Sequence, residues 1–235
     1  DFSRRTKAAR IEGWFGATSA VCGQVVAMHL VGGSAAKVSI YRMGYYNGAR
    51  ARFIKSVDVK TPLWKYKVAT DTPPGQYLFR LDARGKRSSF VPLVIRAEKP
   101  KSPVTFISSV LTWQSYNQWG GSSLYKGPDA KRETKAKSVS FNRPYDGDGS
   151  GQFRYMEFPA IYIAEKNGID INYITDIDLE LDPTILRSTR AIVLGGHSEY
   201  WTARMRGAID TVVSRGVSLA VLGGNTGYNQ ISLTD

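Results

Sequence analysis

The 235-residue sequence contains one cysteine, Cys22, only two histidines, and no long uninterrupted apolar segment. A single cysteine excludes an intrachain disulfide and a multi-cysteine metal cluster, so cysteine usage leaves the redox compartment open. No segment approaches the run of about 18 apolar residues that a membrane-spanning helix requires. The sequence therefore predicts a globular protein without a disulfide framework and without a membrane span.

Several signatures of well-known catalytic sites are missing as well. Gly195-Gly196 and Gly223-Gly224 lack the spacing of the Walker and dinucleotide-binding fingerprints. A serine hydrolase is disfavoured because segment 196–200, Gly-His-Ser-Glu-Tyr, lacks the final glycine of a nucleophile elbow, and His29 lies far away in the sequence. Zinc held by histidine and cysteine is excluded for want of ligands. Any bound metal must therefore have mostly oxygen ligands.

Positive charge is in excess, because 32 Lys and Arg residues against 20 Asp and Glu residues give a net charge of +12. Such a balance favours acidic partners such as nucleic acid, anionic lipid head groups or cell-wall polymers. The basic residues nevertheless lie in short dispersed runs, at residues 4–7, 55–67, 84–87 and 131–137. Without a recognisable nucleic-acid-binding motif, these runs are typical of solvated faces and loop tips, which disfavours nucleic acid as the partner.

The first part of the chain carries short alternating apolar runs separated by turn residues. Strands are expected at residues 24–31, 36–43, 51–59, 75–81 and 89–96. This rhythm predicts an antiparallel β-sandwich of immunoglobulin-like type. The charged, proline-bearing segment 97–103 marks the domain boundary, so we expect a sandwich domain at 1–98 and a second domain at 99–235.

The second part alternates between strand and helix patterns. Strands are expected at 104–111, 169–175, 191–194 and 217–222, and helices at 157–166, 181–190 and 203–213. This alternation predicts an α/β domain with a mostly parallel sheet, of flavodoxin- or glutamine-amidotransferase-like architecture. Residues 112–151 are crowded with Trp, Tyr, Asn, Gly and Ser, and a loop of this length is usually functional or mobile.

His197 and Glu199 follow an apolar strand and two glycines, in a loop that leads into a predicted helix. In open α/β sheets, ligands bind at the carboxyl ends of the strands. Further polar side chains follow other predicted strands and should meet them at this edge: Tyr116, Asp176 and Asn225. The alternative is that His197 and Glu199 are solvated loop residues or part of the helix start.

Six short motifs occur in a particular order along the chain. They are Ile-Glu-Gly at 11–13, Ile-Tyr-Arg-Met-Gly-Tyr-Tyr-Asn-Gly-Ala at 40–49, Tyr-Asn-Gln-Trp-Gly-Gly at 116–121, Arg-Pro-Tyr at 143–145, Gly-His-Ser-Glu-Tyr-Trp at 196–201 and Gly-Gly-Asn at 223–225. Together they resemble the C-terminal part of the large (beta) subunit of N,N-dimethylformamidase and its relatives. The resemblance implies a mononuclear Fe(III) site that hydrolyses the C–N bond of a small or linear amide.

The resemblance also assigns roles to individual residues. It implies three metal ligands: Tyr116, Tyr145 and Glu199. Tyr125 is the alternative to Tyr116, and His197 and Asn225 would orient the substrate and the metal-bound water. Such ligands are chemically reasonable, because a hard, highly charged cation suits phenolate and carboxylate oxygens and acidifies a bound water. The alternative for each tyrosine is an aromatic that packs or stacks on a sugar within a glycine-rich loop.

In the family that the motifs resemble, the catalytic domain continues past Gly-Gly-Asn and contributes a further acidic residue. A further chain or a C-terminal segment would then complete the site. Two other functions remain open: a non-catalytic secreted protein that contacts polysaccharide or cell wall through the sandwich and the aromatic loop, and nucleic-acid binding, for which no stacking platform is apparent. The start at Asp1 rather than Met indicates a processed N-terminus, which favours secretion over a cytoplasmic location for a bacterial protein.

Overall fold

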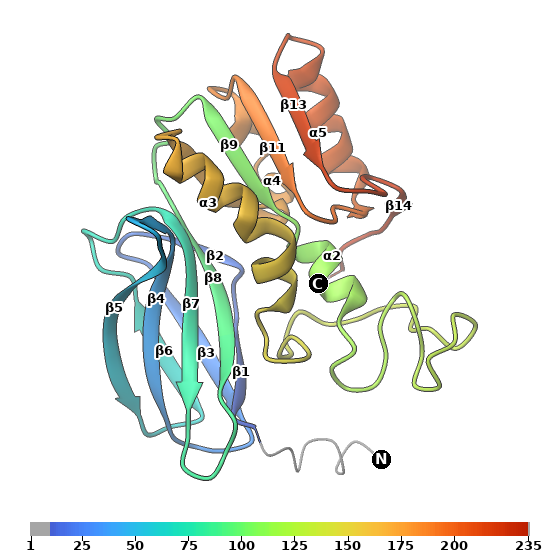
Figure 1. The fold of residues 1–235 in the computed structure, drawn as a ribbon. Coiled ribbons are helices and arrows are strands. Elements are labelled where there is room, and N and C mark those ends of the chain that lie inside the picture. The colour runs from blue at the N-terminus through green and yellow to red at the C-terminus, as the bar shows by residue number, and fades with distance from the viewer. Residues whose placement is uncertain (1–9, 235) are drawn as a thin grey trace.

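The computed structural model describes residues 10–234, and the basic run at residues 4–7 lies outside the described residues. A β-rich N-terminal part is followed by a part in which strands and helices alternate, with helix α3 lying between the two (Figure 1). No helix among residues 10–234 is long and apolar enough to cross a membrane. The combination of mixed sheets, a parallel α/β portion and few helices agrees with the predicted fold class at this level.

Two sheets form the N-terminal part. The first is antiparallel, in the order β1 (Glu12–Phe15), β3 (Val25–Val31), β6 (Leu63–Lys67). The second has the order β2 (Ser19–Val21), β8 (Ser89–Arg96), β7 (Gly75–Asp82), β4 (Ala36–Tyr46), β5 (Ala49–Val59). Its neighbours are antiparallel except for β2 and β8, which are parallel. Five strands were predicted with similar bounds, whereas β1, β2 and β6 were missed because they are short.

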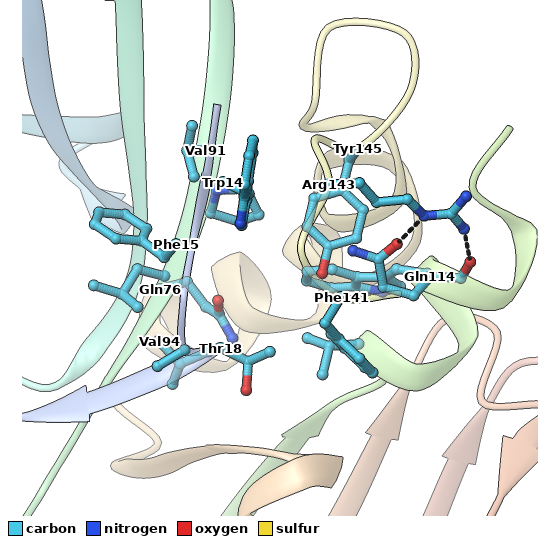
Figure 2. A pocket seen from close by; sticks show the side chains of 15 residues that line it. Trp14, Phe15, Thr18, Gln76, Val91, Val94, Gln114, Phe141, Arg143 and Tyr145 are labelled. Carbon is cyan, nitrogen blue, oxygen red and sulfur yellow. Dashed lines mark hydrogen bonds between the residues drawn. The ribbon is translucent and has the colours of Figure 1, made fainter. Parts of the chain in front are cut away.

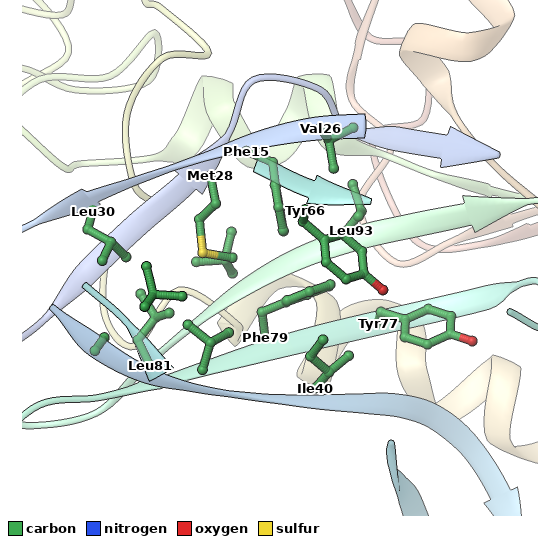
Figure 3. Packing of buried hydrophobic residues seen from close by; sticks show 14 of the residues in the cluster. Phe15, Val26, Met28, Leu30, Ile40, Tyr66, Tyr77, Phe79, Leu81 and Leu93 are labelled. Carbon is green, nitrogen blue, oxygen red and sulfur yellow. The ribbon is translucent and has the colours of Figure 1, made fainter. Parts of the chain in front are cut away.

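Successive side chains of a strand point to opposite faces, and β1 and β3 bury every second side chain, whereas β7 is buried on both faces and β5 is largely exposed. Phe15 and Met28 from the three-stranded sheet meet Ile40, Phe79 and Leu81 from the five-stranded sheet in one cluster (Figure 3). All but Phe15 are completely buried. This cluster is the core that holds the two sheets together.

The C-terminal part is built on a four-stranded parallel sheet, in the order β10 (Ile171–Thr175), β9 (Val104–Ser108), β11 (Ala191–Gly195), β13 (Ser218–Leu222). Its helices are α2 (Val110–Tyr116), α3 (Phe158–Lys166), α4 (Asp176–Leu181) and α5 (Ala203–Val213), with a π-helix at Phe153–Glu157 and a 3-10 helix at Pro183–Leu186. Helices α2, α4 and α5 pack on β9, β10 and β11 through a cluster that contains Leu111, Leu179 and Met205. The predicted parallel sheet is therefore confirmed.

Two predicted boundaries were wrong. The strand expected at 104–111 ends at Ser108, and α2 begins at Val110, so the region predicted as irregular starts with a helix. The helix expected at 181–190 is only a 3-10 helix at Pro183–Leu186, which follows the separate helix α4. The helix expected at 203–213 has these bounds, because Thr202 caps it by accepting from the Met205 backbone N–H. Tyr200 and Trp201, just before it, form strand β12, which pairs with β14 (Asn229–Gln230).

The long loop between α2 and the π-helix is tied to α2 by one buried arginine. Arg143 donates to the backbone carbonyls of Gln114, Asn117, Trp119 and Ser122, at 2.9 to 3.2 Å. Guanidinium groups present five donors in a fixed fork, so one side chain can fix several turns of irregular backbone. The loop therefore has a defined path although it has no regular secondary structure.

The two parts of the chain share a hydrophobic cluster in which Met43, Leu78 and Val94 of the sandwich pack with residues of the α/β part, including Phe106 and Ile161. Polar contacts cross the same junction. The Arg42 guanidinium lies 2.8 Å from the Glu165 carboxylate on α3, and the amide of buried Gln76 donates to the Ser108 hydroxyl at the end of β9. The predicted boundary at residues 98 and 99 thus falls between parts that are packed together.

Candidate functional site

The glycines that follow β11 are required by close packing. A Cβ at Gly195 would collide with the ring of Phe106 on the neighbouring strand. Gly196 has a φ of +63°, and a Cβ there would lie 2.8 Å from the Met156 carbonyl oxygen. Both positions therefore favour glycine, and the turn directs His197 and Glu199 over the carboxyl end of the sheet.

Glu199 is the centre of a hydrogen-bonded group that we call the Glu199 cluster, formed by Tyr116, His197, Glu199 and Asn229. The Tyr116 hydroxyl donates to Glu199 Oε2, and His197 Nε2 lies 2.7 Å from the same oxygen. Asn229 Nδ2 donates to Oε1 at 2.7 Å, and the Glu199 side chain is only 6% exposed. Both carboxylate oxygens are therefore engaged, and the predicted convergence of Tyr116, His197 and Glu199 is present.

The backbone around Glu199 is fixed from two sides. The Thr112 hydroxyl on α2 accepts from the backbone N–H groups of Glu199 and Tyr200, at 3.0 and 3.1 Å. On the other side, the Asn229 N–H donates to the Glu199 carbonyl at 3.0 Å. The carboxylate is thus held by α2 and by β14, two segments that are more than a hundred residues apart.

Burial and the negative charge of Glu199 raise the pKa values of two nearby tyrosines, Tyr116 and Tyr200. Burial, the hydrogen bond to Glu199 and its charge raise the pKa of Tyr116 far above its usual value of 10.0. Burial and the Glu199 charge also raise the pKa of Tyr200. At neutral pH the Tyr116 phenol is therefore protonated and acts as a donor, unless a cation takes the place of its proton.

A cavity of about 400 Å³ opens beside Glu199, and we call it the Glu199 pocket. Its lining combines aromatic, amide and basic side chains: Tyr116, Tyr125, Tyr200, Tyr228, Asn225, Asn229, Arg132 and Lys135, with Glu199 and Leu124. Asn225 adopts a left-handed φ of 56°, a conformation that asparagine tolerates better than most residues. Asn225 lines this pocket together with Tyr116 and Glu199, which it was expected to meet at this edge of the sheet.

Tyr145 lies in a different environment. Its ring packs edge-on against Trp113 with centroids 5.8 Å apart, and it faces the junction with the sandwich beside Gln114 and Arg143 (Figure 2). Burial, followed by the charges of Asp176 and Glu157, raises its pKa well above 10.0. None of the contacts described for Tyr145 reaches the Glu199 cluster, so the structure does not bring this predicted ligand to the other two.

Tyr125, the alternative tyrosine, does lie at the pocket. Its ring centroid is 4.7 Å from that of Tyr116, and its hydroxyl accepts from Arg132 Nη2 at 2.8 Å. Within residues 10–234, no three His, Cys, Asp or Glu side chains converge to hold a metal. A phenol, an imidazole and a carboxylate do converge, however, in Tyr116, His197 and Glu199, and these donors suit a cation that prefers oxygen and nitrogen.

Two buried carboxyl groups lie near Tyr145, and sequence reasoning found only one of them. Asp176 follows β10 as predicted, but its carboxylate accepts from the Leu111 N–H at 3.0 Å and does not join Glu199. Glu157 is completely buried, and its Oε1 accepts from the Ser109 N–H and from Trp113 Nε1. Burial raises the pKa of Glu157 to about 8 and that of Asp176 well above 3.8. No pattern in the sequence indicates that Glu157 is buried.

Sequence reasoning also missed Asn229, Arg132 and Lys135. Asn229 could have been found, because it follows the Gly-Gly-Asn turn that the motif comparison singled out. Arg132 and Lys135 belong to a run that was taken as solvated loop charge, and only the folded loop reveals that they line the pocket.

The sequence matches the family described as "N,N-dimethylformamidase beta subunit-like, C-terminal" over residues 37–235. No curated protein matches it. Among solved structures, an uncharacterized protein from Bacillus anthracis str. Ames is 12% identical with a TM-score of 0.28, over 40% of this chain and 90% of that chain. The sporulation control protein Spo0M from Bacillus subtilis is 13% identical with a TM-score of 0.25, over 38% and 49%. Likenesses this weak carry no argument about fold or function.

Proposed function

The chain belongs to the N,N-dimethylformamidase beta subunit-like family, and from this membership we propose that it hydrolyses the C–N bond of an amide. The observation that carries the proposal is the convergence of Tyr116, His197 and Glu199 at the carboxyl end of β11. A buried carboxylate beside an imidazole, at the wall of a cavity, is a typical arrangement for moving a proton. The secreted binding protein considered from the sequence has no comparable supporting observation.

In the proposed reaction, the water oxygen joins the carbonyl carbon and the C–N bond breaks. One proton must leave the water and one must reach the amine nitrogen. His197 Nε2 lies 2.7 Å from Glu199 Oε2, so the carboxylate holds this nitrogen and stabilises the imidazolium. We assign the transfer to the other ring nitrogen, Nδ1, which takes the first proton and delivers the second. Asn225 lines the Glu199 pocket and offers an amide that can orient the substrate carbonyl.

The family resemblance implies a mononuclear ferric ion, and part of the predicted donor set fits it. Tyr116 and Glu199 supply a phenol and a carboxylate oxygen in direct contact, which is the chemistry that a hard cation prefers. Tyr125 is the further tyrosine that the pocket offers, and Tyr145 would join only if the loop that carries it rearranged. When bound, the ion would supply Lewis acidity toward the carbonyl and the attacking water.

Finer assignments of the fold belong to the same proposal. An immunoglobulin-like sandwich is supported by the three- and five-stranded sheets and their shared core. A flavodoxin- or glutamine-amidotransferase-like second domain, beginning at residue 99, is supported by the parallel order of β10, β9, β11 and β13. We also propose that a further chain completes the enzyme, since the family is named after a subunit.

Metal analysis and activity on a set of simple amides test the proposal. The protein is reconstituted with iron, and the bound metal, the tyrosinate-to-iron absorption and the release of amine are measured for the wild type and for Glu199→Gln. We expect about one iron per chain and amide hydrolysis in the wild type, and loss of both in Glu199→Gln. The matched control is Glu98→Gln, which changes an exposed glutamate. Equal iron content and equal activity in all three proteins would refute the proposal, as would their absence from the wild type.

A further inference from the structure

Two basic side chains, Arg132 and Lys135, line the Glu199 pocket. The only acidic residue in the lining is Glu199, and both of its oxygens are already engaged by Tyr116, His197 and Asn229. Among residues 10–234, neither basic side chain forms an ion pair. Two cations against one carboxylate, whose charge also acts on Arg132, leave the pocket lining with an excess of positive charge.

Arg132 is held in a defined position at this pocket. Its guanidinium carbon lies 4.6 Å from the centroid of the Tyr125 ring, and Nη2 donates to the Tyr125 hydroxyl at 2.8 Å. Tyr125 in turn packs on Tyr116, whose hydroxyl donates to Glu199. One aromatic pair thus separates the guanidinium from the proposed reaction centre, and most of its five N–H donors remain available.

The loop that carries both cations is anchored to the rest of the site. The Leu124 N–H donates to the Ser115 carbonyl on α2, and the Ala136 N–H donates to the Ser123 carbonyl, each at 2.9 Å. These bonds fix the two ends of the segment that contains residues 132 and 135. Both side chains are exposed to solvent, and the backbone that carries them is held beside the pocket.

The size of the pocket points to a substrate larger than a simple formamide. A volume of about 400 Å³ lies in the range of roughly 300–1,000 Å³ found for small-molecule sites, which an amide of about five heavy atoms would leave mostly unfilled. Tyr200, Tyr228 and the two basic side chains line this same space.

We propose that the substrate is an amide that carries a carboxylate group, and that Arg132 and Lys135 bind this carboxylate while the amide lies beside Glu199. The inference rests on the proposed amide hydrolysis. A guanidinium can bind a carboxylate through two parallel hydrogen bonds, and a nearby ammonium adds a second charge. Arg132 and Lys135 are thus specificity-determining residues, whereas the reaction itself takes place at the Glu199 cluster.

A matched pair of substrates tests the inference. N-formylglycine carries a carboxylate, and its methyl ester has nearly the same size without the charge. We expect the wild type to have a kcat/KM at least about tenfold higher for the acid, as is usual for charge-assisted hydrogen bonds. In Arg132→Gln combined with Lys135→Gln, the acid-to-ester ratio should fall by about the same factor, and Arg132→Lys should retain part of it. Lys131→Gln, a neighbouring change outside the lining, should leave the ratio unchanged.

A second measurement separates this inference from the proposed function. The affinity of each protein for N-formylglycine is measured by calorimetry. This measurement is made whether or not the protein hydrolyses the compound. Hydrolysis of both substrates with the same acid-to-ester ratio in the wild type and the double variant would overturn the inference and leave the amidase proposal intact. If no amide is hydrolysed, binding that is lost in the double variant but kept in Lys131→Gln would support the anion site alone. Binding that is absent or equal in all the proteins would overturn it.

Discussion

Glu157 offers the sharpest test of the structure outside the pocket. Its carboxyl group is completely buried, and Oε2 has no hydrogen-bond partner among the described residues. Burial raises its pKa from 4.5 to about 8. Glu157→Gln keeps an oxygen that can accept from Ser109 and Trp113, and it removes the ionisable proton. The variant is therefore a permanent analogue of the protonated acid.

The sign of the effect follows from linkage. In the folded protein Glu157 keeps its proton up to about pH 8, whereas the unfolded chain loses it near pH 4.5. The stability from the protonated acid is fully present below pH 4.5 and is lost as the pH rises through 8. Since one pKa unit corresponds to about 1.4 kcal/mol, the loss across this window approaches about 4–5 kcal/mol. Glu157→Gln should abolish this part of the pH dependence.

Urea denaturation at pH 5 and pH 8 measures the effect. Relative to the wild type, Glu157→Gln should gain several kcal/mol of unfolding free energy between these two pH values. The charge of Glu157 also raises the pKa of buried Asp176, so the measured gain belongs to the pair of buried acids and not to Glu157 alone. Glu133→Gln, at an exposed position, should show no such gain. If the stability difference between wild type and Glu157→Gln is the same at both pH values, Glu157 is not a buried protonated acid.

Three further substitutions test the packing and the junction, each by denaturant unfolding. Phe79→Ala empties the centre of the sandwich core and should cost about 3–5 kcal/mol; a cost below about 1 kcal/mol would contradict the burial of this ring. Gly195→Ala forces a methyl group against Phe106 and should cost about 1–3 kcal/mol, whereas a neutral result would mean that the strands lie farther apart. Arg42→Gln leaves the half-buried Glu165 without its cation and should cost about 2–4 kcal/mol, with a cost that grows as Glu165 ionises; an unchanged stability at neutral pH would argue against the ion pair.

The helices and strands were largely predictable, because apolar residues recur in the sequence with the period of each element. The bounds expected for β8 and α5, residues 89–96 and 203–213, coincide with those in the structure. The junction of β9 and α2 was not predictable. A strand covered on both faces and a helix buried around its whole circumference both appear as a continuous apolar run, and residues 104–113 contain one directly after the other.

The site was predictable where sheet geometry determines it. His197 and Glu199 follow β11, and the parallel order of strands brings that end of the sheet close to α2 and Tyr116. Tyr145 was not predictable in the same way, because it lies in a long loop whose path depends on tertiary hydrogen bonds from Arg143. Its role as a metal ligand stays a prediction that metal analysis of Tyr145→Phe can test.

The contact between Gln76 and Ser108 links the sandwich to the parallel sheet of the second part of the chain. Gln76 belongs to β7, yet its amide touches the last residue of β9, next to the Ser109 N–H that supports Glu157. A different sandwich grafted onto this sheet would have to reproduce that amide and the apolar surface around it. We therefore expect that exchanging the sandwich for one that lacks Gln76 would destabilise the parallel sheet as well.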